Sequence, residues 1–185
     1  MSKIARLPEV TSVIAVVAPN NGQPTCDCIQ PISSNDIGVV VPSRRIGSVF
    51  KLVSGHLPDP SSPDLVLASF TLEKDAGLHL GSVIRVPFYS ASQNSAVFSA
   101  TGAPPKPRGP TLAFRVVGFE ATENEFPSGG TPTYNLYATE GFARTVLPRI
   151  AVYYVYYVYF VRLRDGAADP PRFDAVMSAD GVEGY

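Results

Sequence analysis

The chain has 185 residues, of which 45% are apolar and 17% are charged, and its formal net charge is −1. This length suits one domain or two small ones, and the near-neutral charge without a basic stripe argues against a nucleic-acid-binding protein and a polybasic membrane anchor. The sequence has no run of about 18 apolar residues and no signal-peptide pattern at its start, so it predicts neither a membrane-spanning helix nor a cleaved leader.

The first quarter of the chain predicts short strands. Eighteen prolines and fifteen glycines favour many strands joined by turns. Residues 10–18 are rich in β-branched side chains and predict a strand, and Asn21-Gly22 predicts a hairpin to a partner strand near residues 25–29. A short strand over 39–41 follows, and the apolar spacing of residues 43–53 is helical but interrupted by a glycine.

The stretch 52–89 combines the strongest structural signals. A turn around Gly55 and Pro58 precedes a short apolar strand over 65–68. A helix is expected to start near Ser69 or Thr71 and to stop at Gly77, because serine and threonine cap free N–H groups and glycine tolerates the left-handed conformation. A turn at Gly81 and a strand over 83–88 complete this unit.

The second half predicts further strands and two short helices. The Ser-, Pro- and Gly-rich segment 90–110 predicts a long loop with little core of its own. The expected elements that follow are a strand over 112–119, a loop over 120–133, a strand over 134–138, a helix over 140–147 capped by Thr139, a strand over 151–163 and a helix from Asp169.

These elements predict an α+β fold, mostly β, with a mixed or antiparallel sheet, three or four short helices and long Pro/Ser/Gly loops. We expect one domain over residues 1–185. Two subdomains are the alternative, with residues 52–119 forming a turn–strand–helix–strand core.

No catalytic signature is found. The chain has no glycine-rich phosphate loop, no HExxH and no GxSxG motif. Its two histidines, His56 and His79, both fall in turns, where exposed loop histidines are expected. We therefore expect no catalytic residues, no cofactor and no enzymatic activity.

Two further clusters allow alternatives. Cys26 and Cys28 could be two thiols, a strained local disulfide or half of a metal site, although a zinc site commonly needs four ligands and no histidine lies nearby. Glu120, Glu123 and Glu125 follow a predicted strand. In a Gly/Pro-rich loop we expect them to be solvated, although paired acids can perform acid–base chemistry.

A tyrosine-rich strand is the candidate binding face. Tyrosines occur at positions 153, 154, 156, 157 and 159. They could fill the core, or Tyr154, Tyr157 and Tyr159 could bind a ligand or partner, because tyrosine is favoured at interfaces.

The turn motifs resemble the extracytoplasmic domain of ABC-transporter permeases of the FtsX/MacB type. The family pattern has an apolar pair, Gly-Arg-x-Pro, a strand, a helix, Leu-Gly-x-x-x-Gly and another strand. The matching residues are Leu52, Val53, Gly55, His56, Leu57, Pro58, then Asp64-Leu65-Val66-Leu67, then Gly77, Leu80 and Gly81.

Further matches extend the resemblance over residues 7–175. They are Leu7-Pro8-Glu9-Val10, Val116-Val117-Gly118-Phe119, Phe126-Pro127, Tyr137-Ala138-Thr139 and the passage from Arg162-Leu163 through Gly166 to Phe173. His56 replaces the usual arginine, and neither the segment 90–110 nor the tyrosine strand belongs to the family pattern.

The resemblance implies a non-catalytic, MacB-like periplasmic core domain on the extracytoplasmic face of the cytoplasmic membrane. The intact multi-pass protein would pair with a cytoplasmic ABC ATPase and form a homodimer. It would couple ATP-driven motion to an envelope protein, lipoprotein or peptide. The main alternative is a secreted cell-envelope module that binds glycan or peptide through the tyrosine strand, and a small hydrolase is a third.

Overall fold

In the computed structural model the chain forms two compact units, which are described separately. One unit comprises Met1–Ala15 with Val158–Tyr185, and the other comprises Val16–Tyr157. The structure describes residues 6–8, 10–19, 25–26, 37–42, 50–98, 105–122, 134–152, 158–165 and 170–179.

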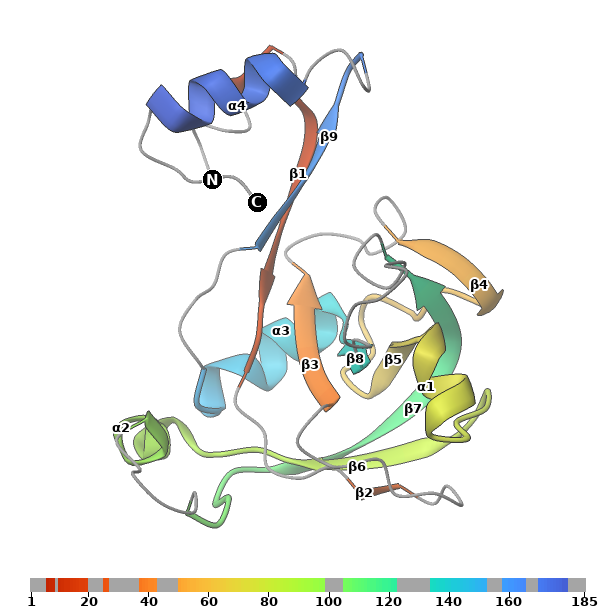
Figure 1. Cartoon of the computed structure of the whole chain (residues 1–185). Coiled ribbons are helices and arrows are strands. Elements are labelled where there is room, and N and C mark those ends of the chain that lie inside the picture. Colours follow the sequence, from red (N-terminus) through yellow and green to blue (C-terminus); the bar gives the residue numbers. More distant parts are fainter. Residues whose placement is uncertain are drawn as a thin grey trace. The chain divides into compact units, whose positions relative to one another are not determined.

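The smaller unit contains two neighbouring strands and a helix. The first six residues of β1 (Val10–Val17) lie beside β9 (Val158–Leu163), and α4 (Pro170–Ala179) follows β9 in the chain (Figure 1). The predicted strand over 10–18 and the predicted helix after Asp169 are confirmed. The two prolines at the start of α4 occupy helical positions whose N–H groups would lack an intrahelical partner.

The larger unit is built on a mixed sheet with the order β2-β6-β7-β5-β8-β3-β1, and β4 also pairs with β7. The β5–β7 and β3–β8 pairs are parallel, whereas β6–β7, β4–β7 and β5–β8 are antiparallel. The strands are β2 (Thr25–Cys26), β3 (Ile37–Pro42), β4 (Lys51–Gly55), β5 (Leu65–Ser69), β6 (Val83–Pro87), β7 (Thr111–Ala121) and β8 (Tyr134–Tyr137).

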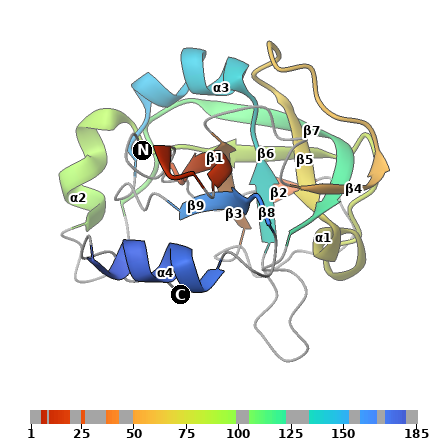
Figure 2. The ribbon, with the colours of Figure 1, turned by 90° about the horizontal axis from the view of Figure 1, so that it is seen from above.

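Short helices connect these strands. They are α1 (Phe70–Asp75), the 3₁₀ helix η3 (Ala91–Gln93), α2 (Asn94–Phe98), α3 (Glu140–Thr145) and the 3₁₀ helix η5 (Leu147–Arg149). Figures 1 and 2 both show α1 and α2 at opposite ends of the β6–β7 pair. The predicted α+β class is confirmed. None of the helices in the described residues is long and apolar enough to cross a lipid bilayer.

The core of the larger unit is formed by the sheet together with buried side chains of α1 and α3. The rings of Phe88, Phe114 and Phe142 are fully buried, with centroids 5.6–6.2 Å apart. Burying each such ring contributes about 2–3 kcal/mol to stability. This aromatic cluster joins the end of β6, the middle of β7 and helix α3.

The hairpin predicted at Asn21-Gly22 is wrong. Strand β2 pairs with β6, with Cys26 opposite Ile84, and the sheet neighbours of β1 are β3 and β9. After β1, Pro19 forms an isolated bridge with Val152, so a distant segment takes the place of the local partner. Long-range pairing overrides the turn signal.

The segment 43–53, whose spacing left its structure ambiguous, ends in a strand. Residues 51–53 belong to strand β4, and the segment 43–49 lies outside the described residues. The apolar side chains of Leu52 and Val53 are exposed, although β4 pairs with β7.

Within the predicted loop 90–110, η3 and α2 cover residues 91–98. A capping box between Ser90 and Gln93 starts this helical segment, which loop composition alone did not indicate.

Candidate interaction surface

The family-like turn begins at a place where only glycine fits. Gly55 has φ +77° and lies opposite Gly118 in the β4–β7 pair. A Cβ atom on Gly55 would lie 2.3 Å from the Val117 carbonyl oxygen and 2.7 Å from the Gly118 Cα. The next residue, His56, donates its backbone N–H to Val117 O at 3.0 Å. The glycine of the motif thus permits direct backbone packing between the turn and β7.

The middle of the turn is closed by an aspartate. The Asp59 carboxylate accepts hydrogen bonds from the Ser61 backbone N–H (2.9 Å) and the Ser61 hydroxyl (2.8 Å). The backbone hydrogen bond from Ser61, and then the hydroxyl hydrogen bond, hold the pKa of Asp59 below its ordinary value of 3.8. The ionised carboxylate therefore favours this turn.

The far side of the turn is joined to helix α3. The Gly141 N–H donates to Pro60 O at 2.7 Å, and a Cβ on Gly141 would lie 2.2 Å from Ser61 O. The Thr139 hydroxyl donates to Ser62 O and accepts from the Phe142 N–H (3.2 Å), which confirms Thr139 as the helix cap. The turn is thus attached to β7 at its start and to α3 near its end.

A second turn lies against the first. Gly77 and Gly81 have φ values of +65° and +87°, which explains both glycines of the Leu-Gly-x-x-x-Gly pattern. The Gly81 N–H donates to Val116 O at 2.8 Å. This turn brings Leu80 close to the first one, since a Cβ on Gly55 would lie 2.8 Å from Leu80 Cδ2.

Strand β4 and the two turns carry exposed apolar side chains. The four large apolar residues that are exposed in the described part of the chain are Leu52 (38%), Val53 (51%), Leu57 (48%) and Leu80 (48%). We call these four residues the apolar surface. The register of the β4–β7 pair shifts between Leu52 and Ser54, and among the described residues β4 pairs only with β7.

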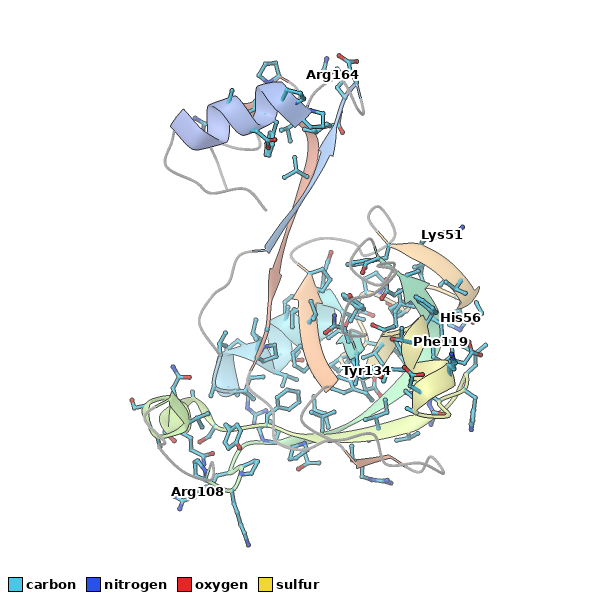
Figure 3. All side chains as sticks on the ribbon, in the orientation of Figure 1. Lys51, His56, Arg108, Phe119, Tyr134 and Arg164 are labelled. Atoms are coloured by element: carbon cyan, nitrogen blue, oxygen red, sulfur yellow. The ribbon has the colours of Figure 1, made fainter. Side chains whose placement is uncertain are left out.

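Figure 3 shows Lys51 and His56 at this end of the larger unit. Exposed apolar groups beside a strand edge that no described strand occupies are typical of a protein-binding surface. Sequence reasoning missed this surface. The sequence did contain a signal for it. Each of the two glycine turns contains a leucine, Leu57 or Leu80, at a position that the core does not reach.

Both histidines are exposed, as predicted. Nδ1 of His56 lies 2.9 Å from Leu57 O, and Nδ1 of His79 lies 3.1 Å from Leu80 O. The motif position filled by His56 acts through its backbone N–H, a contact that does not depend on the side chain. No group of three His, Cys, Asp or Glu residues within the described ranges could hold a metal ion.

The expectation of a solvated Glu120 is wrong. Glu120 is fully buried near the end of β7, because this strand continues to Ala121 between β4 and β5. Glu123 and Glu125 lie outside the described residues, as does Cys28, and the side chain of Cys26 is not described. The alternatives for the cysteine pair therefore stay predictions.

The candidate tyrosine face is not tested. Tyr154 and Tyr157 lie outside the described residues, together with Tyr153 and Tyr156. Tyr159 lies in β9, but its side chain is not described. Binding through this strand stays a prediction.

No family model and no curated protein sequence matches the chain. Several solved structures are similar to it, among them the following two. A domain of a protein assigned as a permease from Porphyromonas gingivalis aligns with a TM-score of 0.49 and 12% identity, over 95% of this chain and 70% of that one. The periplasmic region of MacB from Actinobacillus actinomycetemcomitans aligns with a TM-score of 0.48 and 14% identity, over 98% of this chain and 72% of that one.

Proposed function

We propose that this chain is the extracytoplasmic domain of an FtsX/MacB-type ABC transporter permease and couples ATP-driven motion to a protein partner in the cell envelope. The proposal is supported by the structural role of the glycines in the family-like motif. Gly55, Gly77 and Gly81 each have a positive φ angle, and Gly55 lies in backbone contact with β7. The motif therefore builds a rigid joint and not a reactive centre.

Transmission of a displacement requires elements that move together. The turn that starts at Gly55 is hydrogen-bonded to β7 through His56 and to α3 through Gly141. At its end, Asp64 O accepts from the Arg115 N–H at 2.8 Å, again on β7. A force on any of these three elements reaches the other two without an intervening flexible segment.

The apolar surface supplies the contact in this proposal. It lies on that joint, on β4 and on the neighbouring turn with Leu80. The partner would add an extended segment to the edge of β4 that no described strand occupies, and would cover Leu52, Leu57 and Leu80. Main-chain pairing gives such a contact its affinity, and pockets for side chains give it specificity.

In this proposal the domain itself performs no chemistry. A cytoplasmic ATPase would hydrolyse ATP and act through the membrane part of the permease, which would form a homodimer. The proposal also locates the domain at the extracytoplasmic face of the cytoplasmic membrane.

Purification of the complete natural protein from its native membrane tests this proposal. We expect it to stay in the membrane fraction and to co-purify with an ATP-hydrolysing subunit in fixed stoichiometry. Recovery of the protein from the culture medium, without such a subunit, would contradict the proposal and favour the secreted module with the tyrosine face.

A paired substitution tests the contact surface separately. Leu57→Asp with Leu80→Asp should keep the ATPase subunit but abolish the dependence of ATP hydrolysis on envelope proteins added back to the purified complex. The matched control, Leu57→Met with Leu80→Met, preserves apolar character and should behave as the natural protein. Equal behaviour of the two variants would remove the apolar surface from the proposal.

A further inference from the structure

A second region of the larger unit concentrates positive charge. The whole chain has 16 acidic residues and 15 lysines and arginines, yet no acid occurs in residues 76–119 or in residues 141–164. Seven described cations from these two segments are exposed. Arg85 and Arg115 lie on β6 and β7, and Arg164 follows β9. The other four are Lys106, Arg108, Arg144 and Arg149. We call these four residues the basic corner.

One buried amide fixes the backbone that carries two of these cations. The side chain of Gln93 is only 7% exposed. Its Nε2 donates to Lys106 O at 2.9 Å, and its Oε1 accepts from the Arg108 N–H at 2.8 Å and from the Ser90 N–H at 3.0 Å. The segment with Lys106 and Arg108 is therefore held directly against η3.

The same segment directs both cations outward. Pro105 and Pro107 are half-buried, whereas Lys106 and Arg108 are exposed. The Gly109 N–H donates to Phe88 O at 2.9 Å, and a Cβ at position 109 would lie 2.7 Å from that oxygen. Figure 3 shows Arg108 at the end of the unit that carries α2.

The other two cations come from the end of α3 and from η5. Ile150 forms a bridge with Ser90, and the Ala151 N–H donates to Tyr89 O at 2.8 Å. Arg149 directly precedes Ile150, and the bridge partner of Ile150 is Ser90, the first residue of the capping box. Arg144 lies in the last turn of α3. Figures 1 and 2 both show α2 next to this end of α3.

Four of the five exposed acids described in the larger unit lie away from the basic corner, and the fifth, Glu140, lies on α3 with Arg144. The five acids belong to the turn after Gly55, to α1 and to the first turn of α3: Asp59, Asp64, Glu73, Asp75 and Glu140. No ion pair joins the basic corner to an acid in the described part of the chain. The nearest acid along the chain is Glu140, one helical turn before Arg144.

We propose that the basic corner binds a membrane surface that carries anionic lipid headgroups. The core of a protein–protein interface is typically depleted in charged residues and enriched in aromatic and other apolar ones. The exposed large apolar residues of the described chain all lie at the opposite end of the unit, on β4 and the two glycine turns. Headgroup phosphates move laterally and can match cations that come from separate elements. This inference does not depend on the permease proposal.

Vesicle binding by the full 185-residue chain tests the inference. We expect it to bind phosphatidylglycerol-containing vesicles, not vesicles of phosphatidylcholine alone, and to dissociate at high salt. Lys106→Gln with Arg108→Gln should weaken this binding about 25-fold, because each cation near an anionic surface contributes about fivefold.

The matched control removes the same charge at the other end of the unit. Lys51 and Lys74 are both exposed, and Lys51→Gln with Lys74→Gln should leave vesicle binding unchanged. Equal losses in the two variants would show a net-charge effect and overturn the inference. Equal binding to the two vesicle types would also overturn it, as would binding of poly-glutamate but no vesicles, which would indicate an acidic protein partner. Thermal unfolding checks that all variants fold.

Discussion

The two ends of the β6–β7 pair are held in place by different means. At one end, which we call the glycine end, backbone packs against backbone at Gly55, and the side chains left at the surface are apolar. At the other end, the basic corner, a single buried side chain, Gln93, holds a segment whose surface side chains are cations. The first arrangement couples the turn to neighbouring elements. The second fixes a loop that could otherwise separate from the sheet.

This difference predicts which substitutions should destabilise each end. The glycine end should tolerate side-chain changes but not an added Cβ atom at a close backbone approach. The basic corner should tolerate surface changes but lose its local structure when one amide is removed. Three substitutions test the comparison, in order of decreasing effect.

The largest effect is expected at Gly55. Gly55→Ala adds a Cβ atom 2.3 Å from a carbonyl oxygen at a residue with φ +77°, so we expect a loss of about 3 kcal/mol in the free energy of unfolding. Gly77→Ala is the control, because its φ is +65° but no atom lies within 4 Å of the added Cβ. That control should lose only about 1 kcal/mol. Urea denaturation measures both, and equal losses would refute the close-packing account of the glycine end.

A smaller and local effect is expected at Gln93. Gln93→Ala leaves Lys106 O and the Arg108 N–H without their side-chain partner, at a cost of about 2 kcal/mol. Hydrogen exchange should show faster exchange of the Arg108 amide and no change at the His56 amide. The control is Ser92→Ala, at an exposed neighbour of Gln93. A loss of protection spread equally over both ends would contradict the proposed clamp.

The smallest effect is expected from the Asp59 carboxylate, which is fully exposed. Because the folded state lowers its pKa below 3.8, the contribution of the ionised group is fully present above that value and is lost as the pH falls through the folded-state pKa. The difference in unfolding free energy between the natural chain and Asp59→Asn should therefore be constant near neutral pH and shrink at pH values below 3.8. Urea titrations across this range measure it, and a difference that grows on acidification would be inconsistent with the turn geometry.

Local rules predicted much of the glycine end. Gly77 and Gly81 end a helix and form a turn at positive φ values, as the sequence indicates, and Thr139 caps α3. Ser69 occupies the predicted cap position of α1, but its hydroxyl accepts a hydrogen bond from the Asn135 N–H at 3.0 Å. A tertiary contact has replaced the local one.

The features that the sequence did not predict depend on partners far along the chain. The pairing of β2 with β6 and the burial of Glu120 depend on which strands become neighbours. The basic corner has the same origin, because it brings together cations from two acid-free segments that are separated in the chain. Local composition describes residues 90–110 as a loop, and only the contacts of Gln93 reveal how its two ends are joined.

The most direct test of the proposed coupling is surface labelling of the complete natural protein in intact cells. A cysteine introduced as Leu57→Cys, with Cys26→Ser and Cys28→Ser, is exposed to a membrane-impermeant maleimide, with Ser95→Cys on α2 as the control. The account predicts that both positions are labelled from outside the cell. It also predicts that arresting ATP hydrolysis with vanadate in the detergent-purified complex, where the reagent and the nucleotide both have access, changes the labelling rate at position 57 and not at position 95. Labelling only after cell lysis, or a rate at position 57 that is independent of ATP, would contradict the account.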